Sequence, residues 1–141
     1  MEITTSLDGI TAERIAEGFF EGWPSPPSPQ THLALLQGSL AVALALDDDG
    51  QVVGFANAVG DGVLCAYIPL LEVLESHRGR GIGTQLVERL VEAVSPCYMI
   101  DVACDDDVVP FYERIGFTPS NAMIRRDYAA QSGTTSGVGE A

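Results

Sequence analysis

The order of apolar and polar positions divides the chain into strand-like runs separated by tight turns. Apolar runs over residues 40–46, 51–59 and 63–74 predict three strands, since short apolar runs bounded by glycine and aspartate are typical of strands. An Asp-Gly pair closes the turn 47–50 and favours a hairpin. We therefore expect three consecutive antiparallel strands in the middle of the chain.

Helices are expected in four segments of the chain. A helix over residues 10–20 runs into the proline-rich loop 23–29, whose prolines end it, and a second helix covers residues 29–36. Trp23 in this loop is expected to plug the core rather than to cover a substrate as a lid. A longer amphipathic helix carries apolar residues at positions 86, 87, 90, 91 and 94, and a short helix follows over residues 108–115.

The remaining segments complete one domain over residues 1–128. Residues 97–103 predict a buried strand, and further strands are expected from Phe117 onward, with a terminal one over residues 123–126. The segment 129–141 is small, polar and rich in glycine, serine and threonine, and we expect it to be disordered. The predicted fold is therefore α+β, with a mostly antiparallel sheet flanked by helices.

The charge balance narrows the classes of partner. The 141 residues include seven arginines, no lysine and 20 acidic residues, which gives a net charge of −13. Such a surface repels nucleic acid and anionic membranes, so neither is expected as a partner. No apolar run is long enough to span a bilayer, and the first residues lack the features of a signal peptide, so a soluble cytoplasmic protein is expected.

Metal and disulfide chemistry are not expected from the ligand-forming residues. The three cysteines form no CxxC pair, and the two histidines share no ligand spacing with each other or with a cysteine. We therefore predict no metal site.

Three glycines and two arginines fall within the seven residues 78–84, directly before the long amphipathic helix. Glycines at alternate positions let the backbone expose successive N–H groups, and the start of a helix adds unpaired N–H groups and the positive end of its dipole. This combination predicts a site for a phosphate group on an otherwise acidic protein.

Two segments together resemble the GCN5-related N-acetyltransferase (GNAT) superfamily. Residues 71–83 resemble its cofactor strand and pyrophosphate loop, in which Arg78, Gly81 and Gly83 match the pattern Arg/Gln-x-x-Gly-x-Gly/Ala. Residues 109–117 resemble its Tyr-Glu-x-x-Gly-Phe segment. The chain departs from the family at Asp105, where many members have asparagine, and we expect this carboxylate to point away from the cofactor or to cap the next helix.

The resemblance implies a GNAT-like fold with a splayed pair of strands and acetyl-CoA as co-substrate. It assigns the pantetheine arm to the backbone of Val73 and Leu74, in the manner of an added strand. It assigns the pyrophosphate to the loop formed by Arg78, Gly79, Arg80, Gly81, Ile82, Gly83 and Thr84.

The resemblance also implies transfer of an acetyl group to an amine, with Tyr112 as the general acid that protonates the departing thiolate. Glu72 and Asp101 are the main candidates for the base, and Glu75 and Tyr67 are further ones. Asp101 interrupts an apolar run, so it has either a raised pKa in a functional pocket or a structural partner such as an arginine. Glu72 is expected to reach the acceptor site, where it acts as a base or binds an ammonium group.

Two other classes of function remain open at this point. A dinucleotide-binding protein is disfavoured because Thr84 stands where its third glycine belongs. A domain that binds acyl-CoA as a sensor without catalysis fits the same motifs. The acceptor is expected to be a small molecule or peptide amine, and the negative charge favours a cationic one. Pairing of sheet edges makes a homodimer possible.

Overall fold

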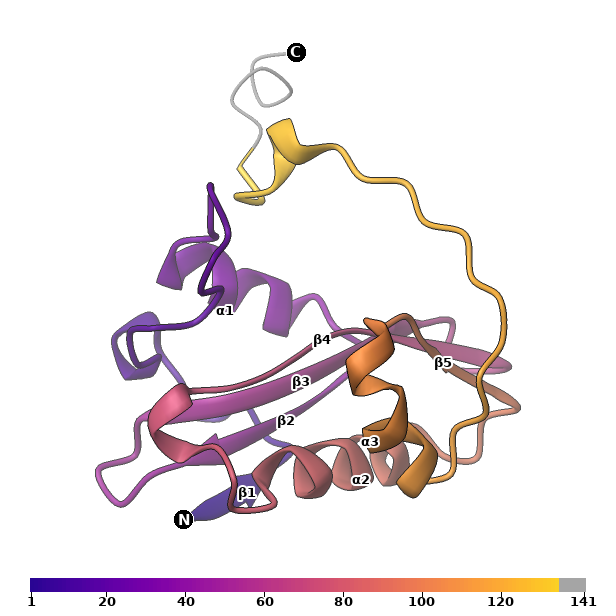
Figure 1. Cartoon of the computed structure of the whole chain (residues 1–141). Helices are drawn as coiled ribbons and strands as arrows, with labels where there is room; N and C mark the ends of the chain where they lie inside the picture. The colour runs from indigo at the N-terminus through magenta and orange to yellow at the C-terminus, as the bar shows by residue number, and fades with distance from the viewer. Residues whose placement is uncertain (135–141) are drawn as a thin grey trace.

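The computed structural model describes residues 1–134, which form a five-stranded sheet in the order β1-β2-β3-β4-β5 (Figure 1). Antiparallel pairing joins the first four strands, and β5 runs parallel to β4. The strands are β1 (Glu2–Thr4), β2 (Ala41–Leu46), β3 (Val52–Gly60), β4 (Cys65–Val73) and β5 (Met99–Val102). The three central strands thus form the predicted meander, and the mixed, mostly antiparallel sheet confirms the α+β fold.

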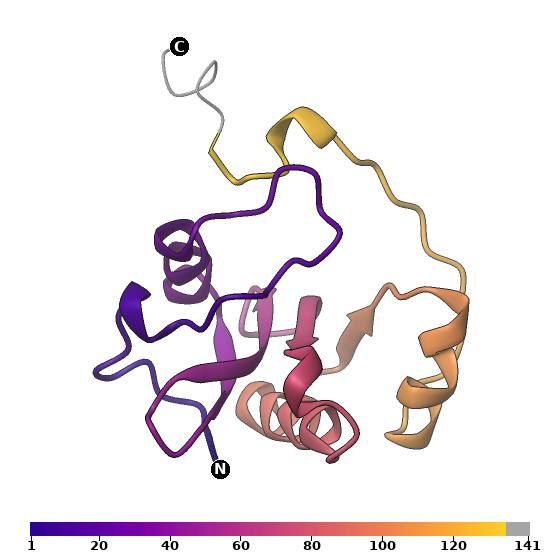
Figure 2. The ribbon, with the colours of Figure 1, turned by 60° about the vertical axis from the view of Figure 1, so that its left-hand side comes forward.

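Helices cover both faces of the sheet (Figures 1 and 2). On one face lies α1 (Pro29–Gln37), and on the other lie α2 (Ile82–Val94) and α3 (Val109–Arg114). Short 3-10 turns are η1 (Ala12–Arg14), η2 (Glu75–His77), η3 (Asp106–Val108) and η4 (Tyr128–Ala130). Within residues 1–134, the helices are all too short or too polar to cross a membrane.

The core consists of two layers because successive side chains of β2 point to opposite faces. Val42, Leu44 and Leu46 belong to the layer beneath α1, together with Phe55 of β3. Ala43 and Ala45 face α2, where these small side chains leave room for the fully buried Leu86 and Leu90. The face of α2 that carries its apolar residues is therefore fixed against the sheet, which also fixes the position where this helix begins.

The predicted helix over residues 10–20 is wrong, since only the single turn η1 forms there. Ile10, Ile15 and Phe20 are all buried in the layer beneath α1, and their spacing of five residues does not suit one face of a helix. Gly18 and Phe20 have φ angles of 110° and 61°, which interrupt a regular helix. The amide N–H of Ala16 donates to Val52 C=O, so this segment follows the edge of β3 instead.

The C-terminal segment also differs from the prediction. No strand forms among residues 117–134, and residues 118–127 instead leave the body as an exposed extended arm (Figure 2). The predicted buried strand 97–103 is the shorter β5, which pairs only with β4 and lies at the edge of the sheet. Of the tail expected to be disordered, residues 129–134 are described next to α1, with Ser25 N–H donating to the Gln131 side chain at 3.0 Å, and residues 135–141 lie outside the described residues.

Candidate functional site

Strands β4 and β5 separate halfway along β4. The two strands pair from Cys65 to Ile68 only, and among residues 1–134 the rest of β4 has no partner on that side. The register between β3 and β4 shifts between Asn57 and Val59, which places a bulge at Pro69, a residue without a backbone N–H. Because a bulge bends its strand, the second half of β4 diverges from β5 and leaves a gap at the sheet edge.

The backbone of Leu71 and Val73 faces this gap. Leu74 N–H donates to Val53 C=O at 2.9 Å, so Leu74 points its amide toward β3. Alternate residues of a strand direct their backbone groups to opposite sides, and Leu71 and Val73 therefore direct theirs away from β3. The prediction for Val73 agrees with this geometry, whereas the N–H of Leu74 is already engaged.

The loop after β4 has the conformation of an anion cradle. Gly79 and Gly81 have φ angles of 80° and 76°, in the region that side chains disfavour, and nothing lies within 4 Å of a Cβ built on either. Gly81 is the N-cap of α2, and no side chain in the described part of the chain caps this end of the helix. The first N–H groups of α2, on Ile82, Gly83 and Thr84, are therefore available to a ligand.

The two arginines of the loop extend along its backbone. Arg78 Nε donates to Val73 C=O at 3.0 Å, and Arg80 donates to Ser76 C=O at 3.4 Å. Both side chains are exposed. Arg78 thus links the loop to the unpaired half of β4, and the two guanidinium groups place positive charge beside the start of α2.

Tyr112 is buried on α3 at the α2 face of the sheet. Its ring packs edge-on against Phe111 and Phe117 at centroid distances of 4.9 and 5.4 Å, and Phe117 N–H donates to the Tyr112 carbonyl. Burial raises the pKa of Tyr112 to about 12, with smaller contributions from the neighbouring Cys104 and Tyr67. The phenol therefore keeps its proton at neutral pH and is able to donate it.

Glu72 lies on the opposite face of β4 from Val73. One of its oxygens accepts a hydrogen bond from Phe20 N–H at 2.8 Å, in the loop before α1. Burial raises the pKa of Glu72, although this hydrogen bond and the charge of Arg78 act in the opposite direction. The carboxyl is thus partly withdrawn from water at the edge of the sheet.

Asp101 lacks, within residues 1–134, the arginine partner that was one of the two environments expected for it. Its side chain is exposed on β5, and no arginine pairs with it among residues 1–134. It lies opposite Tyr67 in the register of β4 and β5. Asp105 occupies the N-cap position of η3, but its side chain makes no capping hydrogen bond within residues 1–134.

A cavity of about 940 Å³ opens between β5, α3 and the C-terminal arm. Asp101, Cys104 and Tyr112 line it from the body, and Ile124 and Arg126 line it from the arm. On the α1 face, Trp23 lines a smaller, mostly apolar cavity of about 420 Å³. The Trp23 ring also packs at a tilt against Phe20, so this side chain closes the core beneath α1 as expected.

Leu71 and Cys104, two neighbours of the predicted residues, were not identified as site residues from the sequence. Leu71 was identifiable, because the strand alternation that exposes Val73 also exposes the residue two positions earlier. The approach of Tyr67 and Cys104 to Tyr112 depends on the packing of α3 and has no local signal. Within residues 1–134, no three metal-ligating side chains gather.

Comparison with known proteins agrees with this geometry. The model of the acetyltransferase (GNAT) family matches residues 11–117. A crystal structure of an acetyltransferase from Deinococcus radiodurans R1 is 47% identical, with a TM-score of 0.90 over 93% of this chain and 91% of that chain. A GNAT family acetyltransferase from Streptococcus pneumoniae is 27% identical, with a TM-score of 0.72 over 89% of this chain and 97% of that chain.

Among curated proteins, the GCN5-related N-acetyltransferase 3 of Arabidopsis thaliana is 39% identical over 71 residues, which cover 49% of this chain. The match spans only 30% of the length of that relative. The family match covers most of the chain, and it includes the gap in the sheet, the glycine loop and α3. The chain therefore belongs to the GNAT family of acetyltransferases.

Proposed function

We propose that this protein transfers the acetyl group of acetyl-CoA to a primary amine. The observation that carries the proposal is the continuity of the unpaired half of β4 with the glycine loop at the start of α2. An extended chain of amides next to a phosphate site suits a pantetheine arm that ends in a pyrophosphate.

The residues present fit this co-substrate. The backbone groups of Leu71 and the N–H of Val73 would pair with the pantetheine amides, and the N–H groups at the start of α2 would hold the pyrophosphate. Arg78 and Arg80 would neutralise its charge. Gly79 and Gly81 leave open space where a Cβ would otherwise approach the phosphates.

When bound, acetyl-CoA supplies a thioester, whose acyl C–S bond is replaced by a C–N bond to the acceptor amine. Tyr112 is the proton donor to the departing sulfur, because its phenol is neutral and the residue lines the cavity beside β5. A general acid in this role accelerates a reaction by roughly 10²–10⁴-fold.

The amine must lose a proton before it attacks or as it does so. Glu72 is the better candidate base, since burial raises its pKa and its carboxyl lies on the α1 face, opposite the cradle. Asp101 is exposed at the rim of the larger cavity and is assigned the weaker role of attracting a cationic acceptor.

The test is a screen of primary amines with acetyl-CoA, in which release of free thiol is followed. The proposal predicts turnover with at least one amine and loss of most of it in Tyr112→Phe, while acetyl-CoA binding is retained. Tyr128→Phe is a matched control, because Tyr128 is exposed and lies outside the site. Tight acetyl-CoA binding without thiol release for any amine would contradict the proposal and favour a sensor.

A further inference from the structure

The smaller cavity lies where four parts of the chain meet: the loop before α1, α1 itself, β4 and the segment that contains η4. Figures 1 and 2 show this loop and η4 side by side, and Ser25 N–H joins them by donating to the Gln131 side chain at 3.0 Å. The walls of the cavity are mostly aromatic and branched apolar side chains, namely those of Phe20, Trp23, Leu35 and Leu70. Among residues 1–134, none of those that line it is charged.

Glu72 lies next to this apolar cavity. Leu70 stands two residues before Glu72 on β4, so the two side chains lie on the same face of the sheet. The Glu72 carboxyl also accepts from the N–H of Phe20 at 2.8 Å, and Phe20 is one of the residues that line the cavity. One carboxyl group thus adjoins an uncharged, largely apolar space.

The cavity lies near the expected position of the thioester, a step that rests on the proposed function. A pantetheine arm that runs from the start of α2 past Val73 and Leu71 brings its thioester to the part of β4 that precedes Leu71. Leu70 is the next residue there, and beyond it β4 pairs with β5. A ligand in the cavity therefore has access to the reacting end of the co-substrate.

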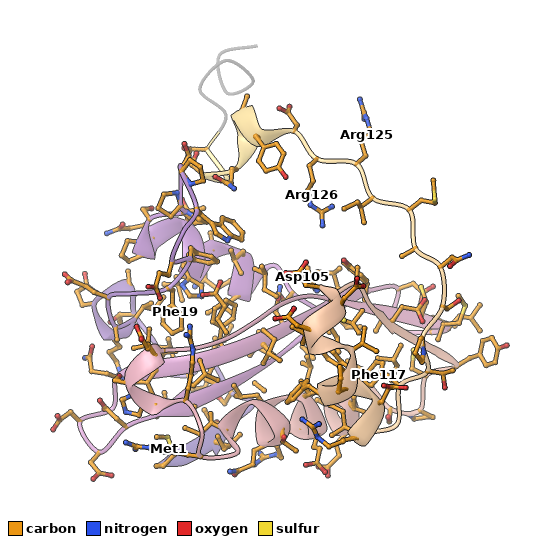
Figure 3. The ribbon with its side chains drawn as sticks, in the orientation of Figure 1. Met1, Phe19, Asp105, Phe117, Arg125 and Arg126 are labelled. Atoms are coloured by element: carbon orange, nitrogen blue, oxygen red, sulfur yellow. The ribbon has the colours of Figure 1, made fainter. Side chains whose placement is uncertain are left out.

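The two faces of the sheet separate the cavity from the proposed proton donor. Figure 3 shows Phe19, which belongs to the layer beneath α1, on one side of the sheet, and Phe117, which packs against Tyr112, on the other side. An amine in the cavity would approach the thioester from the α1 face, while Tyr112 approaches it from the face of α2.

The walls of the cavity determine which amines it suits. The ammonium group of a monoamine is able to pair with Glu72, whereas the second ammonium of a polyamine would lie against apolar walls without a partner, which is costly. An apolar group gains from burial there. Since a cavity of about 150 Å³ holds benzene, the volume of about 420 Å³ has room for an aromatic ring with a short alkyl chain.

We propose that this cavity is the acceptor subsite, and that it takes a primary monoamine whose short chain ends in an uncharged aromatic or branched apolar group. The net charge of −13 attracts cations of every kind, and the apolar walls then select among them. Pockets of this type, apolar with a few polar groups that fix the orientation, are typical of sites for small molecules.

The fluorescence of Trp23 tests the proposal directly, because the chain contains one tryptophan. The full chain is titrated with 2-phenylethylamine and with 1,4-diaminobutane, both alone and with CoA, from which no acetyl group is transferred. The proposal predicts a saturable change with 2-phenylethylamine and a dissociation constant at least about tenfold higher for the diamine. No saturable change with 2-phenylethylamine in either condition, or equal affinity for the two amines, overturns the proposal.

Two variants with the same change of charge show whether the selection takes place in the cavity. Ala34 lines the cavity from α1, whereas Ala93 lies on the exposed face of α2. Ala34→Glu gives a second ammonium a partner and is expected to reduce the preference for 2-phenylethylamine at least about threefold, while Ala93→Glu leaves it unchanged. Circular dichroism checks that each variant is folded. A folded Ala34→Glu chain with the natural preference, or an equal shift in Ala93→Glu, overturns the proposal.

Thiol release, measured on the same amines, separates this proposal from acetyl transfer itself. Release with the diamine, without binding of 2-phenylethylamine, would overturn the apolar subsite and leave acetyl transfer supported. Binding of 2-phenylethylamine at Trp23, without release from any amine, would contradict acetyl transfer and leave the apolar subsite supported.

Discussion

The buried histidine of α1 makes the stability of the protein sensitive to mild acid. His32 is 1% exposed, its ring lies 4.3 Å from that of Phe55 and 5.0 Å from that of Phe20, and its Nε2 atom has no hydrogen-bond partner among residues 1–134. Burial lowers its pKa from 6.5 to about 4. The folded protein therefore holds this ring neutral in a pH range where the unfolded chain binds a proton.

The sign and size of the effect follow from this difference. Between pH 6.5 and about 4 the unfolded chain takes up a proton that the folded chain does not, so the free energy of unfolding falls as the pH falls. Each unit of difference in pKa corresponds to about 1.4 kcal/mol, so the loss from His32 reaches about 3 kcal/mol once the pH is below 4.

Urea unfolding of the full chain between pH 7 and pH 4 measures this loss. His32→Leu is expected to remove most of it, while His77→Gln, a change of the other histidine, is expected to leave it in place. Equal losses in the natural chain and in His32→Leu would refute the assignment.

Three further predictions concern the site. Between pH 7 and pH 10 the thiol-release rate of the natural chain is expected to show no loss from ionisation of Tyr112, because the pKa of Tyr112 is about 12. A fall in the rate over this pH range that Tyr112→Phe abolishes would contradict this prediction. Gly81→Ala places a side chain at a φ of 76°, so it is expected to lower the free energy of unfolding by about 1–2 kcal/mol and to weaken acetyl-CoA binding. The stability of Gly83→Ala, whose Cβ would lie 3.6 Å from Phe111, is expected to be unchanged. Thermal melting and calorimetric titration compare the two variants. Glu72→Gln keeps an acceptor for Phe20 N–H and removes a carboxylate whose pKa burial raises, so it is expected to stabilise the fold at pH 7. As the pH falls, Glu72 of the natural chain becomes protonated and the stability difference between the two chains is expected to shrink. A difference that grows on acidification would contradict the assignment.

The central meander, α2 and the glycine loop were predictable because their signals are local. The turn at residues 47–50 and the helical spacing of apolar residues in α2 each depend only on near neighbours in the sequence. Gly79 and Gly81 adopt the positive φ angles that a phosphate cradle requires, and the predicted loop is therefore consistent with the structure.

The ends of the chain were not predictable in this way. Residues 10–20 bury Ile10, Ile15 and Phe20 through the path of the backbone around β3, and this path is set by tertiary contacts rather than by periodicity. Residues 123–126 have the composition of a strand but pair with no strand among residues 1–134. A strand needs a neighbour to satisfy its backbone, so composition alone does not decide whether it forms.

The same difference between local signals and tertiary contacts applies to the site residues. The backbone of Val73 faces away from β3, as its predicted role requires, whereas Leu74 uses its N–H within the sheet, because a single residue of register decides which side an amide faces. Asp101 was expected either to lie in a functional pocket or to have a structural partner, because its neighbours in the sequence are apolar. It is exposed, since β5 is an edge strand with an alternating burial pattern.

The most direct test of the account is the mapping of acetyl-CoA on the protein by the amide chemical shifts of the labelled full chain. The account predicts that the largest changes fall on Leu71, Val73 and residues 79–84, with the N–H groups at the start of α2 becoming protected from exchange. Saturable binding whose largest changes lie instead on the α1 face or on the outer surface of the sheet, with residues 79–84 unaffected, would contradict it.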